Sequence, residues 1–210
     1  MRRKPVHDVP VKLDLDWLRR RFAAAAPLPA STYGDEGARP VRETLTPASV
    51  LIPIVARETE PTMLFTRRTA HLKEHSGQVS FPGGRVEPQD AGPEATALRE
   101  TQEEIGLEAR HVELLGRLPE YHTRTGFRIT PVIGVLTPPF ELRRDEHEVD
   151  EIFEVPLAFL LDPANHQRQS REWQGELRWF FAISYQRHYI WGATAGILVN
   201  LYRHVSQGRL

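Results

Sequence analysis

The feature that most constrains the fold is a glycine-containing loop followed closely by a helical segment with its acidic side chains on one side. The loop is SFPGGRVEPQD, residues 80–90, and the helical segment is ALRETQEEIGL, residues 97–107. At about 100° per residue, Glu100, Glu103 and Glu104 fall on one face, and the aliphatic residues fall near the opposite one. We therefore predict a helix that packs its apolar side on a sheet and presents three carboxylates together.

Three neighbouring carboxylates destabilise a helix unless something binds them. Each like-charged i,i+4 pair costs about 0.2–0.5 kcal/mol, and negative charge is disfavoured in the C-terminal half of a helix. Mg²⁺ removes both objections, because it accepts carboxylate oxygens and keeps positions for water and substrate phosphates. A solvated acidic face is the alternative interpretation. Gly106 is expected to end the helix.

The remaining segments predict an α+β fold in which one long helix lies between strands. We expect helices at 13–26, 90–105, 157–161 and 192–205, and strands at 47–57, 62–68, 78–82, 112–122, 127–136, 177–185 and 188–191. Pro53 predicts an edge position or a bulge for the first strand. The predicted organisation is an N-terminal helix and loop extension, residues 1–44, followed by one domain, residues 45–210.

Composition limits the partners of the chain. The net charge is -1, so no global field favours nucleic acid or an anionic membrane. There are no cysteines, which excludes disulfides and thiolate metal sites and fits a reducing compartment. No stretch approaches the roughly 18 apolar residues that span a bilayer, and no apolar segment follows the basic start of the chain. We expect a cytoplasmic monomer or homodimer that acts on a small molecule.

The loop and helix together resemble the Nudix box, G-x5-E-x7-R-E-U-x-E-E-x-G-U, where U is aliphatic. The matching residues are Gly84, Arg99, Glu100, Glu103, Glu104, Gly106 and Leu107. The loop is one residue longer than the usual box, Asp90 stands where glutamate is usual, and Thr101 stands where an aliphatic residue is usual. The resemblance implies the Nudix fold, a mixed central β-sheet sandwiched between helices. The bracing role of the first box glutamate carries over to Asp90 only weakly.

The segment LFTRRTAHLKEHSGQVSFPGG, residues 64–84, is similar to a motif of the coenzyme A pyrophosphatase branch of Nudix hydrolases. That branch also carries the lengthened loop, and the resemblance covers most of residues 45–200. It implies Mg²⁺- or Mn²⁺-dependent hydrolysis of coenzyme A, and possibly of its thioesters, to 3',5'-ADP and 4'-phosphopantetheine. Alternatives are a Nudix pyrophosphatase for ADP-ribose or a dinucleotide, and a catalytically silent ligand-binding module, against which the intact glutamates count.

The resemblance and the residue chemistry together define candidate site residues. The metal ligands are expected to be Glu100, Glu103, Glu104 and the carbonyl of Gly84 (or Gly83). The catalytic candidates are Glu103 or Glu148 as general base and Arg99, which orients a glutamate. The substrate-binding candidates are Arg68, His75, Ser80, Phe81, Tyr121 and Arg124. The alternatives are a surface ion pair for Arg99, a solvated loop for Glu148, solvated cations for Arg68, His75 and Arg124, and core packing for Tyr121.

Overall fold

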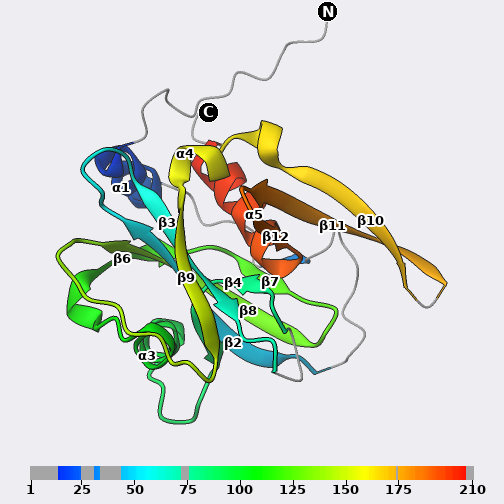
Figure 1. Cartoon of the computed structure of the whole chain (residues 1–210), viewed down its shortest axis with the longest axis horizontal. Coiled ribbons are helices and arrows are strands. Elements are labelled where there is room, and N and C mark those ends of the chain that lie inside the picture. Colours follow the sequence, from blue (N-terminus) through cyan, green and yellow to red (C-terminus); the bar gives the residue numbers. More distant parts are fainter. Residues whose placement is uncertain (1–13, 25–30, 34–43, 72–75, 174, 207–210) are drawn as a thin grey trace, which may run out of the picture.

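The structure is a computed structural model that describes residues 14–24, 31–33, 44–71, 76–173 and 175–206. It confirms the predicted α+β arrangement, a mixed sheet with helices on both sides (Figure 1). The helices are α1 Leu15–Ala24, α3 Pro93–Ile105, α4 Leu157–Leu160 and α5 Ala193–Ser206, with short 3-10 turns at Ala109–His111 and Pro163–Asn165. No helix in the described ranges combines the length and apolar character that a membrane crossing requires.

The larger sheet is built around two long parallel strands, β2 Thr46–Val55 and β8 Phe127–Leu136. The strand order is β1-β7-β8-β2-β3-β4, while β5 pairs with β2, β6 with β8 and β9 with β3. The other strands of this sheet are β1 Ser31–Tyr33, β3 Thr62–Arg68, β4 Val79–Ser80, β5 Gly83–Arg85, β6 Val112–Arg117, β7 Glu120–His122 and β9 Val149–Pro156. The sheet is therefore mixed, and the glycines of the loop are part of it.

The expectation that Pro53 marks an edge strand or a bulge is wrong. Strand β2 lies inside the sheet and pairs with β8 without interruption over its whole length. On its other side, β2 pairs with β5 at Ala48–Val50 and with β3 only from Ile54 onward. The amide of Leu51 donates to Pro82 O on this side, and amide directions alternate along a strand. The missing N–H of Pro53 therefore faces the gap between two successive partners.

Helices α3 and α5 lie on opposite faces of the large sheet (Figure 1). Ile105 of α3 packs in one buried cluster with Leu64, and Leu198 of α5 packs in another with Phe65. Successive side chains of a strand point to opposite faces, so Leu64 lies in the core under α3 and Phe65 lies in the core under α5. Helix α3 and the loop before it are thereby held against β2 and β3.

Several boundaries differ from the expected ones for local reasons. Helix α3 begins at Pro93 rather than at Asp90, because Pro suits the first helical turn and Gly92 is its N-cap. The expected strand 112–122 is two strands, and the β6–β8 register shifts between Leu114 and Gly116. The acidic segment before α4, expected to be a loop, contains β9. Its acids are paired with arginines, as Arg57 shows by donating to Glu154 at 3.1 Å.

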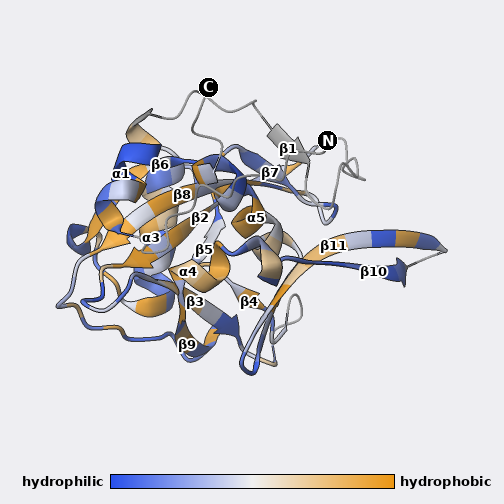
Figure 2. Cartoon of the chain, turned by 90° about the horizontal axis from the view of Figure 1, so that it is seen from above, coloured by the Kyte–Doolittle hydropathy of each residue, from blue (hydrophilic) through white to orange (hydrophobic). Residues whose placement is uncertain are grey.

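A second, smaller sheet has the order β10-β11-β12, with β10 Gln167–Trp173, β11 Glu176–Tyr185 and β12 His188–Trp191. The expected strands 177–185 and 188–191 correspond to β11 and β12, and β10 was not predicted. Figure 2 shows β10 and β11 projecting from the body as a hairpin. Ile183 and Ile190 anchor this sheet in the main core.

Helix α1 is packed into the core. Leu18 is buried in the cluster that contains α5, and the Arg19 guanidinium donates to Glu113 of β6 at 2.6 Å. We expect Leu18→Ala to lower the free energy of unfolding by about 2–5 kcal/mol, because it deletes buried methyl groups and leaves a cavity. Chemical denaturation measures this change. An effect no larger than that of an exposed substitution such as Arg20→Ala would contradict the described packing.

Candidate active site

The glycine loop brings backbone and carboxylate together. Strand β5 pairs with β2, so that Gly83 and Gly84 lie beside Val50 and Ser49. A Cβ added at Gly84 would overlap the carboxyl group of Glu100, and one added at Gly83 would overlap the backbone of Ser49 and Val50. Glycine is required at Gly83, where backbone blocks any side chain, whereas a side chain at Gly84 would displace the Glu100 carboxylate, which rests directly on the loop.

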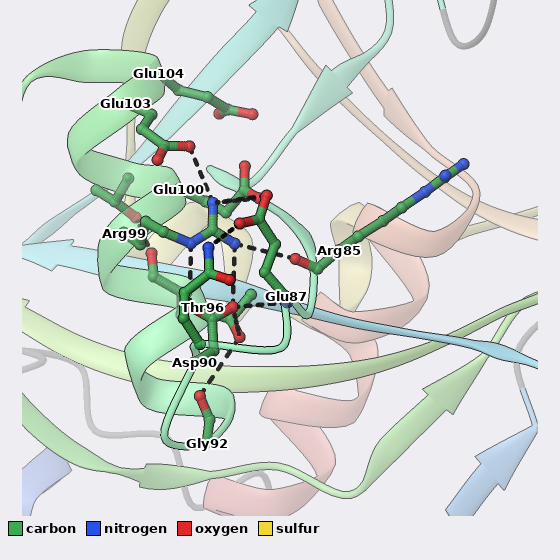
Figure 3. A network of polar contacts seen from close by, with 12 residues as sticks. Arg85, Glu87, Asp90, Gly92, Thr96, Arg99, Glu100, Glu103 and Glu104 are labelled. Atoms are coloured by element: carbon green, nitrogen blue, oxygen red, sulfur yellow. Dashed lines mark hydrogen bonds and ion pairs between the residues drawn. The ribbon is translucent and has the colours of Figure 1, made fainter.

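Arg99 is the centre of the polar network drawn in Figure 3. Its Nε and Nη2 donate to the two oxygens of Asp90 at 3.1 Å each, and Nη2 also donates to Arg85 O at 3.1 Å. Its Nη1 donates to Glu103 Oε2 at 3.0 Å and lies 3.0 Å from Glu100 Oε1. Arg99 therefore joins the loop to two of the three helix glutamates, which is more than a surface ion pair.

Asp90 holds the loop onto the first half of α3. Its Oδ2 accepts from the Glu87 amide at 2.9 Å and from the Thr96 hydroxyl at 2.8 Å, in addition to Arg99. The Arg99 guanidinium, the Glu87 amide and the Thr96 hydroxyl keep the pKa of Asp90 well below its usual range. Asp90 thus makes the bracing contacts that the sequence suggested only weakly.

Two threonines in this region were not predicted to matter. The sequence analysis missed the Thr96 hydroxyl, which is buried between Asp90 and the start of α3. Thr96 lies three residues before Arg99, so helical spacing alone would have placed both residues on one face. Thr101 stands where an aliphatic residue is usual and is fully buried. Its hydroxyl donates to Ala97 O at 2.6 Å, so the extra polar group is satisfied within the helix.

Glu104 is the most buried of the three helix glutamates, with 5% of its side chain exposed. Burial raises its pKa to about 8, and the nearby Glu148 and Glu100 carboxylates add to the rise. Arg68 opposes it from 4.0 Å, as does a backbone hydrogen bond from Gly83. The Oε2 atom of Glu104 is buried and has no hydrogen-bond partner in the described part of the chain. The surroundings of Glu104 therefore favour its protonated form, and a bound cation would take the place of that proton.

Glu148 comes close to Glu104 from a segment later in the chain. The amides of Arg143 and Asp145 donate to the last carbonyls of α3, Ile105 O and Glu104 O, at 2.8 Å each. These bonds dock the loop before β9 on the helix end. The Glu148 carboxylate is 49% exposed and lies 4.0 Å from the Arg68 guanidinium. The solvated-loop interpretation is therefore incomplete, because Glu148 faces the glutamate cluster.

The donor set fits a divalent cation. Burial raises the pKa of Glu100, Arg99 opposes the rise, and Glu103 and Glu148 add to it. As placed, no three His, Asp or Glu side chains within the described ranges are grouped closely enough to hold a metal ion, and Arg99 binds two of the candidates. The unpartnered Glu104 oxygen and the mutual repulsion of the carboxylates are what a cation would relieve.

The substrate-binding candidates do not all lie at this cluster. Phe81 and Tyr121 are each 3% exposed and pack in the main core, which favours core packing over their interpretation as substrate contacts. Arg124 pairs with Glu176 of β11 at 3.1 Å, whereas Arg68 pairs with Glu104 and Glu148. Ser80 is half-buried, and its hydroxyl lies 3.1 Å from that of Thr66. His75 lies outside the described residues.

Comparison with known proteins defines the class of the chain. A model of the NUDIX domain matches residues 45–184. The chain therefore belongs to the Nudix hydrolase family, and its fold is the Nudix fold. Nudix hydrolases act on nucleoside diphosphate derivatives and generally need divalent metal ions, so the chain is a Nudix pyrophosphohydrolase.

Two curated relatives carry a name at the level of the family. The chain is 41% identical to "Uncharacterized Nudix hydrolase NudL" of Escherichia coli (strain K12 / DH10B), over 76% of this chain and 84% of that protein. It is 42% identical to the protein of the same name from Enterobacter sp. (strain 638), over 73% and 80%. A solved structure, a Nudix hydrolase from Alicyclobacillus acidocaldarius, superposes with a TM-score of 0.48 at 18% identity, covering 79% of this chain and 95% of that one.

Proposed function

We propose that the enzyme hydrolyses the pyrophosphate bond of coenzyme A to 3',5'-ADP and 4'-phosphopantetheine, with Mg²⁺ or Mn²⁺ as cofactor. The observation that carries the proposal is the 64–84 segment, which resembles the coenzyme A branch and leads directly into the glutamate cluster. Within this segment, Arg68 lies 4.0 Å from both Glu104 and Glu148. A guanidinium at the edge of the carboxylate cluster is suited to donate hydrogen bonds to a phosphate oxygen of the substrate.

The proposed metal ligands are Glu104, Glu100 and Glu103, with a backbone carbonyl of the loop at Gly84 or Gly83. When bound, the divalent ion would screen the charge of the pyrophosphate and lower the pKa of a water ligand. Arg99 keeps Glu100 and Glu103 oriented toward one another through a single guanidinium. Buried Glu104, whose surroundings favour its protonated form, would bind the ion as a carboxylate and would therefore give up a proton to it.

We propose Glu148 as the general base, since its carboxylate is half exposed to water whereas that of Glu103 is hydrogen-bonded to Arg99. Glu148→Gln is expected to lower kcat about 10²–10⁴-fold at saturating metal. Glu103→Gln is the matched variant and is expected to weaken apparent metal affinity more than it lowers kcat at saturating metal. The reverse pattern would assign the base to Glu103.

The proposed substrate makes a direct prediction about the 3'-phosphate. Coenzyme A should be hydrolysed at least about tenfold faster, as kcat/KM, than dephospho-coenzyme A, because one charge-assisted contact is worth about 1.5–3 kcal/mol. A panel with ADP-ribose and a dinucleoside polyphosphate, each with Mg²⁺ and with Mn²⁺, measures this preference. Faster turnover of ADP-ribose or the dinucleotide, with coenzyme A left intact, would overturn the coenzyme A assignment and keep the Nudix chemistry.

We further propose that residues 45–210 form the catalytic domain and residues 1–44 an extension of it. The cytoplasm is the proposed location, which suits a chain without cysteine. Fractionation of cells that express the chain at its natural level tests the location, and recovery of the protein outside the cytoplasmic fraction would refute it.

A further inference from the structure

The projecting hairpin has an open edge. In the small sheet β10 pairs only with β11 among the described strands, so the outer backbone groups of β10 have no strand beside them. The opposite edge strand, β12, lies against β4 and α5. A two-stranded ribbon is marginally stable in water, and an open edge is a template for another strand. The hairpin is therefore where a further strand can add.

One face of the hairpin carries an apolar strip, Leu177, Trp179 and Phe181. These alternate residues of β11 share a face with Ile183, which is fully buried in the main core. Leu177 is 60% exposed and Trp179 is 38% exposed, so the strip becomes uncovered as it leaves the body. The hairpin thus extends a core-facing surface outward, and the Arg168 guanidinium, 4.4 Å from the Trp179 ring centroid, covers only part of it.

The side chains of β10 on the same face have a particular order. Cross-strand partners share a face, and Arg168 pairs with Phe181, Ser170 with Trp179 and Glu172 with Leu177. A cation and an anion therefore flank a small central serine at equal spacing. This order is complementary to its own reverse: when a second β10 runs antiparallel about Ser170, each Arg168 faces a Glu172.

We propose that two copies of the chain associate through β10, paired antiparallel about a two-fold axis at Ser170. The two small sheets then form one continuous sheet with both apolar strips on the same face. Two Arg168–Glu172 pairs cross the seam, and the two Ser170 side chains leave room above it for the Trp179 rings. The interface is isologous, as a two-fold dimer requires.

Neighbouring registers are less favourable. Centring the pair on Arg171 sets two Arg171 side chains directly opposite each other, and like charges in that position are destabilising. Centring it between Ser170 and Arg171 puts the two apolar strips on opposite faces, because a one-residue shift reverses the direction of every side chain. Of these three registers, the one at Ser170 satisfies both charge and burial.

A charge swap tests the pairing. The wild-type chain is expected to dimerise in sedimentation equilibrium, and Glu172→Arg to raise the dissociation constant at least about tenfold, because both seam pairs become repulsive. Adding Arg168→Glu to Glu172→Arg restores opposite charges and should recover the dimer. A wild-type monomer at every concentration, or a double variant no tighter than Glu172→Arg alone, overturns the proposal.

Cross-linking tests the register. The chain has no cysteine, so Ser170→Cys introduces a single thiol, at the proposed two-fold axis. Directly opposite residues have Cα atoms about 4.5–5.5 Å apart, within disulfide range. Oxidation should give a covalent dimer in high yield. The control Arg171→Cys places its thiols on the other face with Cα atoms about 8 Å apart, beyond that range. Equal cross-linking of both variants contradicts this register. Dimerisation is independent of the substrate assignment.

Discussion

Replacing Glu104 by glutamine is expected to abolish hydrolysis and, at the same time, to stabilise the metal-free protein. The loss of rate should be at least about 100-fold, because the variant removes a buried oxygen donor on which the proposed metal site depends. The stabilisation follows from the burial of Glu104, whose Oε2 has no hydrogen-bond partner among the described residues. Glutamine has nearly the same shape and cannot ionise.

The gain in stability should depend on pH in a defined direction. Burial raises the pKa of Glu104 from 4.5 to about 8, so the folded chain binds this proton more tightly than the unfolded chain. The associated stability is fully present below about pH 4.5 and is lost as pH rises through 8. At about 1.4 kcal/mol per pKa unit, the rise from 4.5 to about 8 is worth about 4–5 kcal/mol, so we expect the variant to be more stable than wild type by up to that amount at pH 8.5 and nearly equal at pH 4.5.

Denaturation of both proteins in a chelator, at the two pH values, measures this difference. Added Mg²⁺ or Mn²⁺ should then raise the melting temperature of the wild type and leave that of Glu104→Gln almost unchanged. A variant that is less stable than wild type at high pH would contradict the burial of an uncompensated carboxylate. Unchanged hydrolysis would show that Glu104 is not part of the active centre.

Gly84→Ala is expected to cause a second large loss of activity, again at least about 100-fold in kcat/KM. The added methyl group would occupy the position of the Glu100 carboxyl, and it can be accommodated only if Glu100 or the loop moves. Small displacements of catalytic groups cost about this much. Steady-state kinetics at saturating metal measures the loss.

Gly92→Ala is the matched control for this substitution. A Cβ at Gly92 has only an ordinary contact with the Glu94 side chain at 3.8 Å, and this glycine lies between the same loop and α3. We expect its activity to stay within about threefold of wild type, since ordinary van der Waals contact carries no clash. Equal losses in the two variants would mean that loop flexibility, rather than the close approach of Glu100 to Gly84, determines the rate.

The sequence predicts the parts of the molecule that depend on local pattern. The helical spacing of Glu100, Glu103 and Glu104 and the Gly106 cap place the carboxylates on α3 as expected, and Gly106 adopts a left-handed conformation. The hairpin of β2 and β3 also follows from two apolar runs separated by a turn. These features need no knowledge of the rest of the fold.

Features that depend on distant partners could not be predicted in the same way. Strand β9 was not predicted because its acidic residues indicate a solvated loop. In the fold, arginines from other strands or turns, such as Arg57 and Arg67, pair with these acids. Burial of Phe81 and Tyr121 is a tertiary property, so the sequence cannot separate a core aromatic from a substrate contact. The docking of the Glu148 loop on α3 rests on two backbone bonds that no side-chain pattern encodes.

The most direct measurement is product identification after incubation of coenzyme A with the purified chain. With Mg²⁺ or Mn²⁺ we expect equal amounts of 3',5'-ADP and 4'-phosphopantetheine by mass spectrometry, and neither product with chelator or with Glu104→Gln. Reaction in water enriched in ¹⁸O should place one label in one of the two products, as cleavage of a phosphoanhydride by water requires. Coenzyme A that remains intact with either metal, while wild type binds the ion, would contradict the proposed function.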